Sequence, residues 1–441
     1  MINICVFEDT LYKNLLPLTF NKPSYDLLIG IDTPLDKIKR YFSHANITLH
    51  CRNYLKPLLK KEHTQLAINK INTGAPGLFI NGRVIMNKKV FTAINKFKEK
   101  QNHLLTYQGH VIAIYVSDEL LSYMSKTLET IPTAQNLIQY LRNKCVSKEL
   151  KECDLINSPV DLIYLNSNTI NEDFKYKNTP GIIKGNLKPF ANIYNEDNVF
   201  IDKESIVEDN VVINAEQGPV YIENNVIIEA GSRLEGPLFI GANSQIKGAR
   251  LSKSSIGQYC KIGGEISNSV INSFTNKGHY GFMGHSYIGS WVNLGAGTTT
   301  SNMKNTYGTI SVSVNGEIID SEKQFLGSIL PDHCKCGIGT HLNCGSIIGF
   351  GSNLFGTEIH SKIIPNFSWG ESGKYETLQI DKFTEIIKRV KKRRNKSLLK
   401  VEKELYDYLY EEDQLIMTPP IQKTKNKEVE IKKNETKLSK S

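Results

Sequence analysis

The chain has 441 residues, of which 40% are hydrophobic, so it is long enough for two or three domains that each bury a core. The start of the chain turns acidic by Glu8 and no run of about 18 apolar residues occurs, so we expect neither a leader nor a membrane span. Eight scattered cysteines without a CxxC pair indicate reduced thiols, and we expect a cytoplasmic protein.

The net charge of +9 is concentrated at the end of the chain, because residues 381–441 hold 17 Lys/Arg and 11 Asp/Glu and so account for +6. The run "KRVKKRRNK" (388–396) could attract nucleic acid or an anionic membrane surface. The alternative is a solvated helix face, which we favour because no aromatic residues are interleaved. We therefore expect no nucleic acid partner.

Residues 1–190 alternate between short apolar strands and helical stretches. We expect strands at 2–7 ("INICVF") and 45–51 ("ANITLHC"), and helices at 32–42 and 128–144. This alternation predicts a layered α/β domain.

Residues 191–370 follow a period of six. Apolar residues recur six apart in several runs, which are Ile201, Val207, Ile213; Ile222, Ile228, Leu234; Ile240, Ile246; Ile256, Ile262; Ile288, Leu294; and Leu330, Cys336, Leu342, Ile348, Leu354. A helix needs a spacing of three and four and a strand a spacing of two. A period of six predicts a triangular parallel β-helix in which the apolar residue points inward and Gly or Asn takes the bend.

The regular repeat breaks between Ser269 and Tyr287, and again over 301–323, where we expect a loop or arm. Loops that interrupt a coil are common places for sites. Helical spacing returns in 371–415, and we expect the Lys-rich stretch 416–441 to be a disordered basic tail.

The stretch "NKGHYGFMGHSYIGSWVNLGAGTTTSN" (276–302) places His279 in the first break. A histidine there is a candidate general base, since imidazole titrates near neutral pH. Glu265 comes about one coil earlier, so its carboxylate could orient the ring. The alternative is that His279 only caps a turn.

Several motifs of this stretch resemble the acetyltransferase half of the bifunctional GlmU family. "KGH", Gly284, Ile288-Gly289, "VNLGAGT" and Ser301-Asn302 match that family at the same spacing. The resemblance implies a left-handed β-helix, a homotrimer, and acetyl transfer from acetyl-CoA to glucosamine-1-phosphate or a similar amino sugar. That chemistry belongs to UDP-N-acetylglucosamine biosynthesis for the cell envelope.

The resemblance also implies roles for single residues. His279 takes the place of the catalytic base and Glu265 that of the orienting carboxylate. The other positions match substrate-binding residues (Asn293, Asn302, Arg250 and Phe282) and acetyl-CoA contacts (Ala296, Ser328 in "QFLGS", and Cys344). Ser267 replaces the family's phosphate-binding lysine and Phe282 replaces its sugar-contacting tyrosine, while His285 stands at an acidic position, so the acyl acceptor is open.

The segment "LLPLTFNKPSYDLL" (15–28) resembles the signature of sugar-nucleotide pyrophosphorylases, which implies UTP and Mg²⁺ as partners of the N-terminal domain. The glycine-rich phosphate loop of those enzymes is missing, and Ser24 stands at the lysine position. Lys22 or Lys13 could substitute as a weak nucleotide-binding group. The metal-binding Gly-Asp is replaced within Asn81–Arg83, and Asp173 is an unassigned carboxylate.

The segment "PDHCKCGIGTH" (331–341) has a composition that suits zinc. Cys336 falls on an inward position of the repeat, however, where a small hydrophobe is expected. We therefore assign no metal site.

Three hypotheses remain. The first is an amino-sugar transferase whose β-helix transfers acetyl groups and whose N-terminal domain transfers a uridylyl group. The second is a sugar-1-phosphate nucleotidyltransferase whose β-helix only assembles trimers. The third is a non-catalytic sugar-nucleotide-binding protein.

Overall fold

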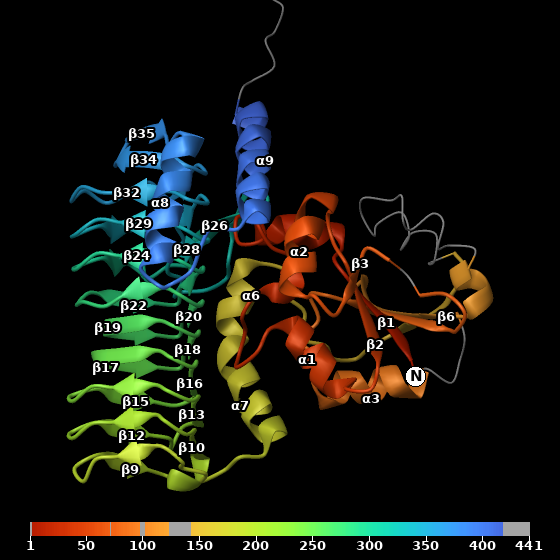
Figure 1. Ribbon diagram of the computed structural model, residues 1–441, viewed down its shortest axis with the longest axis horizontal. Coiled ribbons are helices and arrows are strands. Elements are labelled where there is room, and N and C mark those ends of the chain that lie inside the picture. Colours follow the sequence, from red (N-terminus) through yellow and green to blue (C-terminus); the bar gives the residue numbers. More distant parts are fainter. Residues whose placement is uncertain (1, 71, 98–101, 123–142, 418–441) are drawn as a thin grey trace, which may run out of the picture.

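The computed structural model describes residues 2–70, 72–97, 102–122 and 143–417. The helix expected at 128–144 lies almost entirely outside these residues, as does the expected tail beyond 417. Two bodies lie side by side, a tall coil of short strands and an α/β domain (Figure 1).

The α/β domain is built on a seven-stranded sheet, which confirms the predicted layered class. Its order is β3 (Ala67–Ile68), β2 (Asn46–His50), β1 (Asn3–Phe7), β4 (Gly77–Asn81), β6 (His110–Val116), β5 (His103–Tyr107) and β7 (Val146–Glu149). The first four strands are parallel, and β6 is antiparallel to both of its neighbours. The helices are α1 (Pro34–Tyr41), α2 (Lys56–Glu62), α3 (Lys88–Phe97), α6 (Pro159–Tyr164) and α7 (Asn166–Lys177).

Local sequence explains the first helix well. Thr33 caps α1 by accepting a hydrogen bond from the Asp36 backbone N–H at 3.2 Å, and Pro34 occupies the first turn, where no amide donor is needed. Leu35 and Ile38 are buried beneath it. The strands predicted at 2–7 and 45–51 are β1 and β2.

The coil has three faces of parallel strands, named here by their members. Face 1 holds β10 (Val199–Ile201), β13 (Val220–Ile222), β16 (Leu238–Ile240), β18 (Ser255–Ile256), β20 (Val270–Ile271), β23 (Tyr287–Ile288), β28 (Ile329–Leu330), β31 (Ile347–Ile348) and β33 (Ile363–Ile364). Face 2 holds β8 (Asn186–Leu187), β11 (Ile206–Val207), β14 (Ile227–Ile228), the starts of β17 (Gln245–Ser252) and β19 (Lys261–Ser267), β21 (Asn276–Lys277), β24 (Asn293–Leu294), β29 (Lys335–Cys336), β32 (Asn353–Leu354) and β34 (Ser368–Glu371).

Face 3 holds β9 (Asn192–Tyr194), β12 (Val212–Asn214), β15 (Arg233–Glu235), the ends of β17 and β19, and β22 (Phe282–Gly284). It continues through β25 (Thr299–Thr300) and β30 (His341–Leu342). Pairing of the coil begins at Ile183, which bridges to Ile201.

The predicted inward residues form one continuous core inside the coil. Every apolar residue of the six-residue period is buried there, Cys336 included. The period therefore predicted the β-helix because one residue per strand meets the axis whatever its neighbours are.

The break expected between Ser269 and Tyr287 is wrong, because the coil continues through β20, β21 and β22 without interruption. The repeat only looked broken because Lys277 takes an inward position beside Ile262 and is fully buried. Its ammonium group is bound by the carbonyl oxygens of His279 at 3.0 Å and Tyr280 at 3.3 Å. An amine can therefore replace an apolar side chain at this position.

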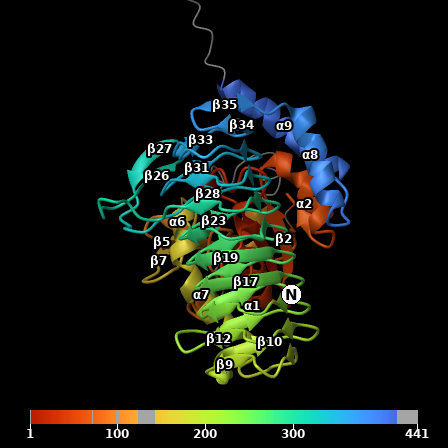
Figure 2. The same ribbon diagram turned by 90° about the vertical axis from the view of Figure 1, so that its left-hand side faces the viewer.

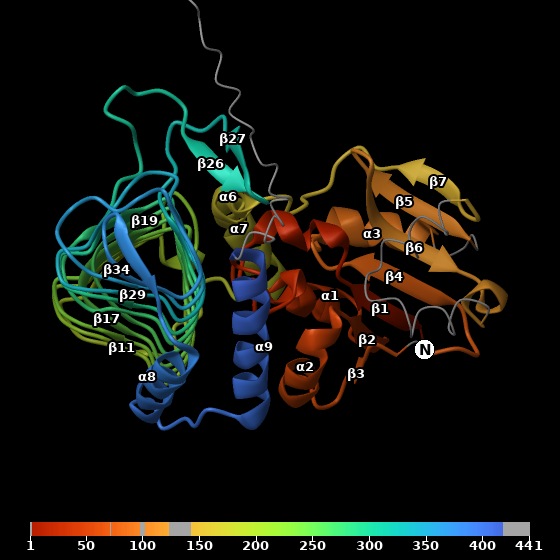
Figure 3. The same ribbon diagram turned by 90° about the horizontal axis from the view of Figure 1, so that it is seen from above.

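The second expected interruption is confirmed as an arm. Residues 311–320 form an antiparallel hairpin of β26 (Ser311–Val314) and β27 (Glu317–Asp320), and the coil resumes at Ile329, which pairs with Tyr287. The hairpin projects beside α6 (Figure 3). Ile310, which precedes the hairpin, and Val312 within it are buried against face 1.

The α/β domain packs on face 1 of the coil, with α6 and α7 between the two bodies (Figure 1). The Ser255 hydroxyl donates to the Gly30 carbonyl at 2.7 Å, and the Tyr287 hydroxyl donates to the Leu28 carbonyl at 3.2 Å. Face 1 is therefore covered by the same chain.

The chain ends in two helices, as predicted. The hairpin of β34 and β35 (Lys374–Thr377) leads into α8 (Ile380–Lys392), which lies along the upper coil (Figure 2). Helix α9 (Lys400–Met417) returns toward the α/β domain, where it contacts α2 (Figure 3). Residues of both helices share a hydrophobic cluster with the α/β core. Within the described ranges, no helix is long and apolar enough to cross a bilayer.

Candidate functional site

His279 lies exposed at the corner between faces 2 and 3. Its backbone packs on the preceding coil, where a methyl group on Gly263 would come within 3.2 Å of the His279 nitrogen and one on Gly264 within 3.0 Å of its oxygen. Gly264 also has a φ of +80°, which favours glycine. Together with Lys277, these glycines hold the His279 backbone in place while its imidazole faces solvent.

Three predicted residues line up on face 3. Arg250 pairs in register with Glu265, and Glu265 pairs with Phe282, while the residues that follow them point into the core. The three side chains therefore share the outer surface of one face. No ion pair joins Arg250 and Glu265, and no hydrogen bond joins Glu265 and His279, among the residues that the structure describes.

Asn302 lies at the opposite corner, between faces 3 and 1. Its amide is 3.1 Å from Nδ1 of His285, whose ring stacks on Phe325 with centroids 5.4 Å apart. Burial, with a smaller contribution from Lys253, lowers the pKa of His285 to about 4. His285 is therefore neutral at physiological pH and suited to a hydrogen bond with an amide.

Two residues expected to contact acetyl-CoA are inaccessible within the chain. Ser328 is 0% exposed and its hydroxyl donates to the Asn343 carbonyl at 3.2 Å. Cys344 is 3% exposed and packs in the cluster beneath the arm and α6. Ala296 remains partly exposed after β24.

Asn293 lies on face 2, away from the outward column of Arg250, Glu265 and Phe282 on face 3 (the Arg250 column). Its side-chain oxygen accepts a hydrogen bond from the Asn276 amide at 2.8 Å. Asn293 lines a cavity of about 400 Å³ between face 2 and α8. His279 does not line this cavity.

At the C-terminal edge of the parallel strands, two buried ion pairs lie where the pyrophosphorylase resemblance indicates a phosphate-binding loop. Glu8 is bound by Arg52 at 2.8 Å, and Asp9 is bound by Arg83 at 2.7 Å and by the Asn81 amide at 2.9 Å. All of these groups are buried. The carboxylates are saturated by guanidinium groups, so a divalent cation does not fit at the position that the pyrophosphorylase resemblance indicates.

The candidate nucleotide-binding lysines do not converge on that edge. Lys22 instead reaches the coil, where its ammonium lies 2.7 Å from the Asp332 carboxylate. Lys13 is exposed on the helical turn η1 (Thr10–Leu15), and Ser24 is fully buried. Asp173 is structural, because Lys37 (2.5 Å), Arg40 and the Ile31 amide all bind its carboxylate in the core.

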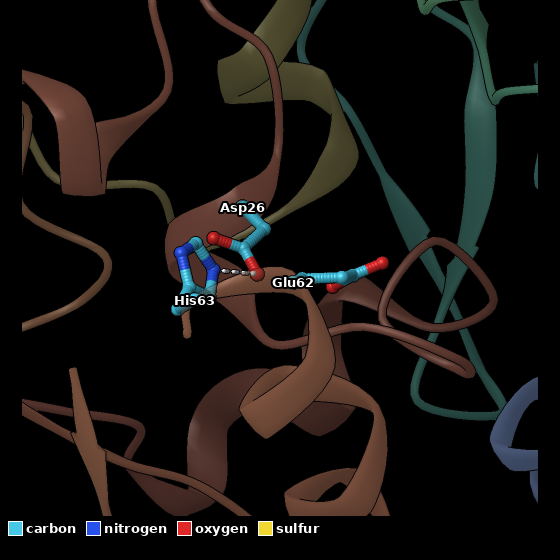
Figure 4. Close-up of side chains that lie close together, drawn as sticks. All are labelled: Asp26, Glu62 and His63. Carbon is cyan, nitrogen blue, oxygen red and sulfur yellow. Dashed lines mark ion pairs between the residues drawn. The ribbon is translucent and has the colours of Figure 1, made fainter. Parts of the chain in front are cut away.

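Lys22 lines a cavity of about 360 Å³ between the α/β domain, the coil and α9. Asp26, Glu62 and His63 line it too, and their ligand atoms lie within 4.8 Å of one another (Figure 4). Two carboxylates and an imidazole could hold a divalent cation. The buried Asn21 lines the same cavity with an unpartnered side-chain oxygen.

The alternative for this cluster is a plain ion pair. His63 Nε2 lies 3.8 Å from the Asp26 carboxylate. The neighbouring Asp26 carboxylate raises the pKa of His63, which favours the protonated form that cannot bind a metal. Burial and the charge of Asp26 raise the pKa of Glu62 to about 7.

The zinc-like segment contributes no metal ligands. Cys334 and Cys336 point into the coil core, and His333 is buried with Nε2 3.0 Å from the Tyr406 hydroxyl. Asp332 is bound by Lys22 and by the Asn21 amide at 3.0 Å.

Sequence reasoning missed two residues beside His279. Lys277 belongs to the matched "KGH" motif, but the motif does not show that its amine binds the carbonyl oxygens of His279 and Tyr280 in the turn. Tyr280 is 71% exposed, and its carbonyl accepts a hydrogen bond from the Gly297 amide at 3.0 Å. An aromatic residue next to a histidine in a glycine-rich turn was the available signal for Tyr280.

Comparisons with known proteins agree with this architecture. The family described as sugar nucleotidyl transferase matches residues 4–179. The bifunctional protein GlmU of Thermodesulfovibrio yellowstonii is 27% identical over 285 residues, which cover 61% of this chain and 57% of that protein. A bifunctional sugar-1-phosphate nucleotidylyltransferase/acetyltransferase of Sulfurisphaera tokodaii is 32% identical over 165 residues, 36% of this chain and 39% of that protein.

Fold, repeat and family match together indicate a domain similar to sugar nucleotidyl transferases over residues 4–179, joined to a hexapeptide-repeat β-helix. Over parts of its length the chain is similar to bifunctional proteins of the GlmU type. It spans less than two thirds of the length of these relatives.

Proposed function

We propose that the β-helix transfers an acetyl group from acetyl-CoA to the amino group of an amino-sugar phosphate such as glucosamine-1-phosphate. The observation that carries this proposal is the exposed His279 on a turn held by Lys277, next to the outward column of Arg250, Glu265 and Phe282. The column offers a cation for a phosphate and a carboxylate close to the base.

In the proposed step, the amine nitrogen attacks the thioester carbon and a C–N bond forms. His279 accepts the proton that the amine loses, the C–S bond breaks, and the coenzyme leaves as a thiolate that takes up a proton. A fixed donor near the carbonyl oxygen would stabilise the negative charge that develops there. Tyr280 adds an exposed phenol beside Phe282, where the family has a tyrosine.

We further propose that the site is completed by a second copy of the chain in a homotrimer. His279 and Asn302 stand at opposite corners of face 3, and Ser328 and Cys344 are covered within the chain. Because Ser328 and Cys344 cannot reach a coenzyme on face 3, a second copy packed against this face would supply the missing contacts.

The test is thiol release from acetyl-CoA with glucosamine-1-phosphate. We expect release by the wild type and a loss of at least about 100-fold in His279→Ala, since general bases contribute roughly 10²–10⁴-fold. His341→Ala is the matched control, because His341 is an exposed histidine further along face 3. Equal release by His279→Ala and wild type would overturn the assignment of the base.

Nucleotidyl transfer by the α/β domain is a second candidate function, supported by the family match over residues 4–179. Glu8 and Asp9 are already paired with arginines and offer no place for Mg²⁺. Such a reaction would use the cavity that contains Lys22, with the carboxylates of Asp26 and Glu62 as ligands. Mg²⁺-dependent pyrophosphate release from UTP and N-acetylglucosamine-1-phosphate, lost in Asp26→Asn, would support it. Absence of release from wild type would leave the domain a scaffold or binding module.

A further inference from the structure

The cavity between face 2 and α8 is lined by cations without any acidic residue. Lys261, Lys335, Arg393 and Arg394 line it, together with asparagines, aromatic rings and aliphatic side chains, and no Asp or Glu is among the lining residues. Its volume of about 400 Å³ is in the range of small-molecule sites. Four positive charges around one cavity favour a ligand with more than one negative charge.

None of the four cations forms an ion pair within the ranges that the structure describes. The Lys335 ammonium is oriented by the carbonyls of Trp291 and His333, both at 2.9 Å. Burial lowers the pKa of Lys335 to about 8 and also lowers the pKa of Arg394, as expected for cations held out of water without a carboxylate contact.

The coil supplies a ladder of polar groups to the same cavity. Lys261, Asn276, Asn293, Lys335 and Asn353 occupy successive positions of one outward column. Asparagine amides both donate and accept hydrogen bonds, so a column of them suits hydroxyl groups or a polar heterocycle. Trp291 and Trp369 add aromatic surface on which a ring could stack.

We infer that this cavity binds a nucleoside diphosphate or a ligand of the same chemistry, with the diphosphate at Arg393 and Arg394 and the ring near the asparagine column. Arginine binds phosphate oxygens with two parallel donors, and two adjacent arginines suit two phosphate groups. The inference goes beyond the proposed acetyl transfer, because only Asn293 of the residues predicted for that reaction lines the cavity.

The two tryptophans make binding directly observable. The whole chain contains two, and both line this cavity, although Trp291 also lines the cavity beside Lys22. A Trp291→Phe variant keeps an aromatic ring between Phe274 and α8 and leaves Trp369 as the single reporter. Titration of that variant with UDP, followed by its fluorescence, should give a saturable signal, with tighter binding than inorganic phosphate.

Variants then locate the ligand. In the same background, Arg393→Gln and Arg394→Gln should each weaken UDP binding at least about tenfold, as expected for a lost charge-assisted phosphate contact. Arg389→Gln removes the same charge from an exposed position of α8 outside the cavity and should leave binding unchanged. No saturable signal at millimolar UDP, equal affinity for phosphate and UDP, or equal effects of all three substitutions would overturn the inference. None of these outcomes depends on acetyl transfer.

Discussion

Lys277 interrupts the apolar period of the sequence and also holds the turn that carries the candidate base. Its side chain stands in an inward position of the coil, so the apolar period appears to stop there. The buried amine instead binds two carbonyls of the turn that carries His279. The residue that hides the repeat therefore also shapes the turn of the candidate base.

The same amine predicts a pH dependence of stability. Burial lowers the pKa of Lys277 from 10.5 to about 8, so above about pH 8 the folded chain binds fewer protons than the unfolded chain. The wild type should therefore gain stability relative to Lys277→Met as pH rises from 8 toward 10.5, by roughly 3 kcal/mol in total. Below pH 8 the difference should be constant. Denaturant unfolding of both proteins across this range measures it, and parallel curves would contradict the assignment.

At the scale of elements, one series of corners of the coil is turned by aromatic residues, whereas other turns use glycines such as Gly264. Tyr259, Phe274 and Trp291 occupy equivalent corners with φ between 57° and 64°. Their rings stack with centroids 4.9 and 4.2 Å apart and interplanar angles of 3° and 2°. The stack offsets the cost of a left-handed backbone, which is about 1–2 kcal/mol for a residue with a Cβ atom.

This arrangement predicts an unusual order of stability at Phe274. Both Phe274→Ala and Phe274→Gly lose two stacked pairs, on the order of 2 kcal/mol. Glycine should nevertheless be more stable than alanine by about 1 kcal/mol, because it adopts a positive φ without strain. Chemical unfolding of the two variants decides it. A more stable alanine variant would show that the corner relaxes to another conformation.

At the scale of the whole molecule, the α/β domain and the coil are joined by a polar contact as well as by apolar packing. The pair of Lys22 and Asp332 links residues 310 positions apart and is largely buried, with side-chain exposures of 18% and 8%. Asp332 also accepts hydrogen bonds from Asn21 and from the Ser290 amide at 2.8 Å. Removing either Lys22 or Asp332 leaves the other charged side chain buried without a counter-charge.

We predict strong coupling across this contact. Lys22→Met and Asp332→Asn should each reduce the free energy of unfolding by on the order of 3 kcal/mol, and the double variant should lose clearly less than the sum. Lys89→Met is the control, since the pair of Lys89 and Glu152 is solvent-exposed and should contribute little. Additive losses in a double-mutant cycle would mean that Lys22 does not act through Asp332.

The sequence alone determined the architecture of the coil. The six-residue period that begins with Ile201 and Val207 predicts the β-helix, because one residue in each strand faces the axis. The pattern therefore depends only on local geometry. The α/β class and both C-terminal helices follow from local periodicity in the same way. The role of His279 stays a prediction that depends on a short, contiguous motif.

Only the tertiary structure decided which candidate groups are available. It paired Glu8 with Arg52 and Asp9 with Arg83, buried Ser328 and gathered cations from face 2 and α8. Each of these outcomes depends on contacts between residues far apart in the chain. Burial and ion pairing are set by what another segment brings to a side chain, and no local pattern encodes that.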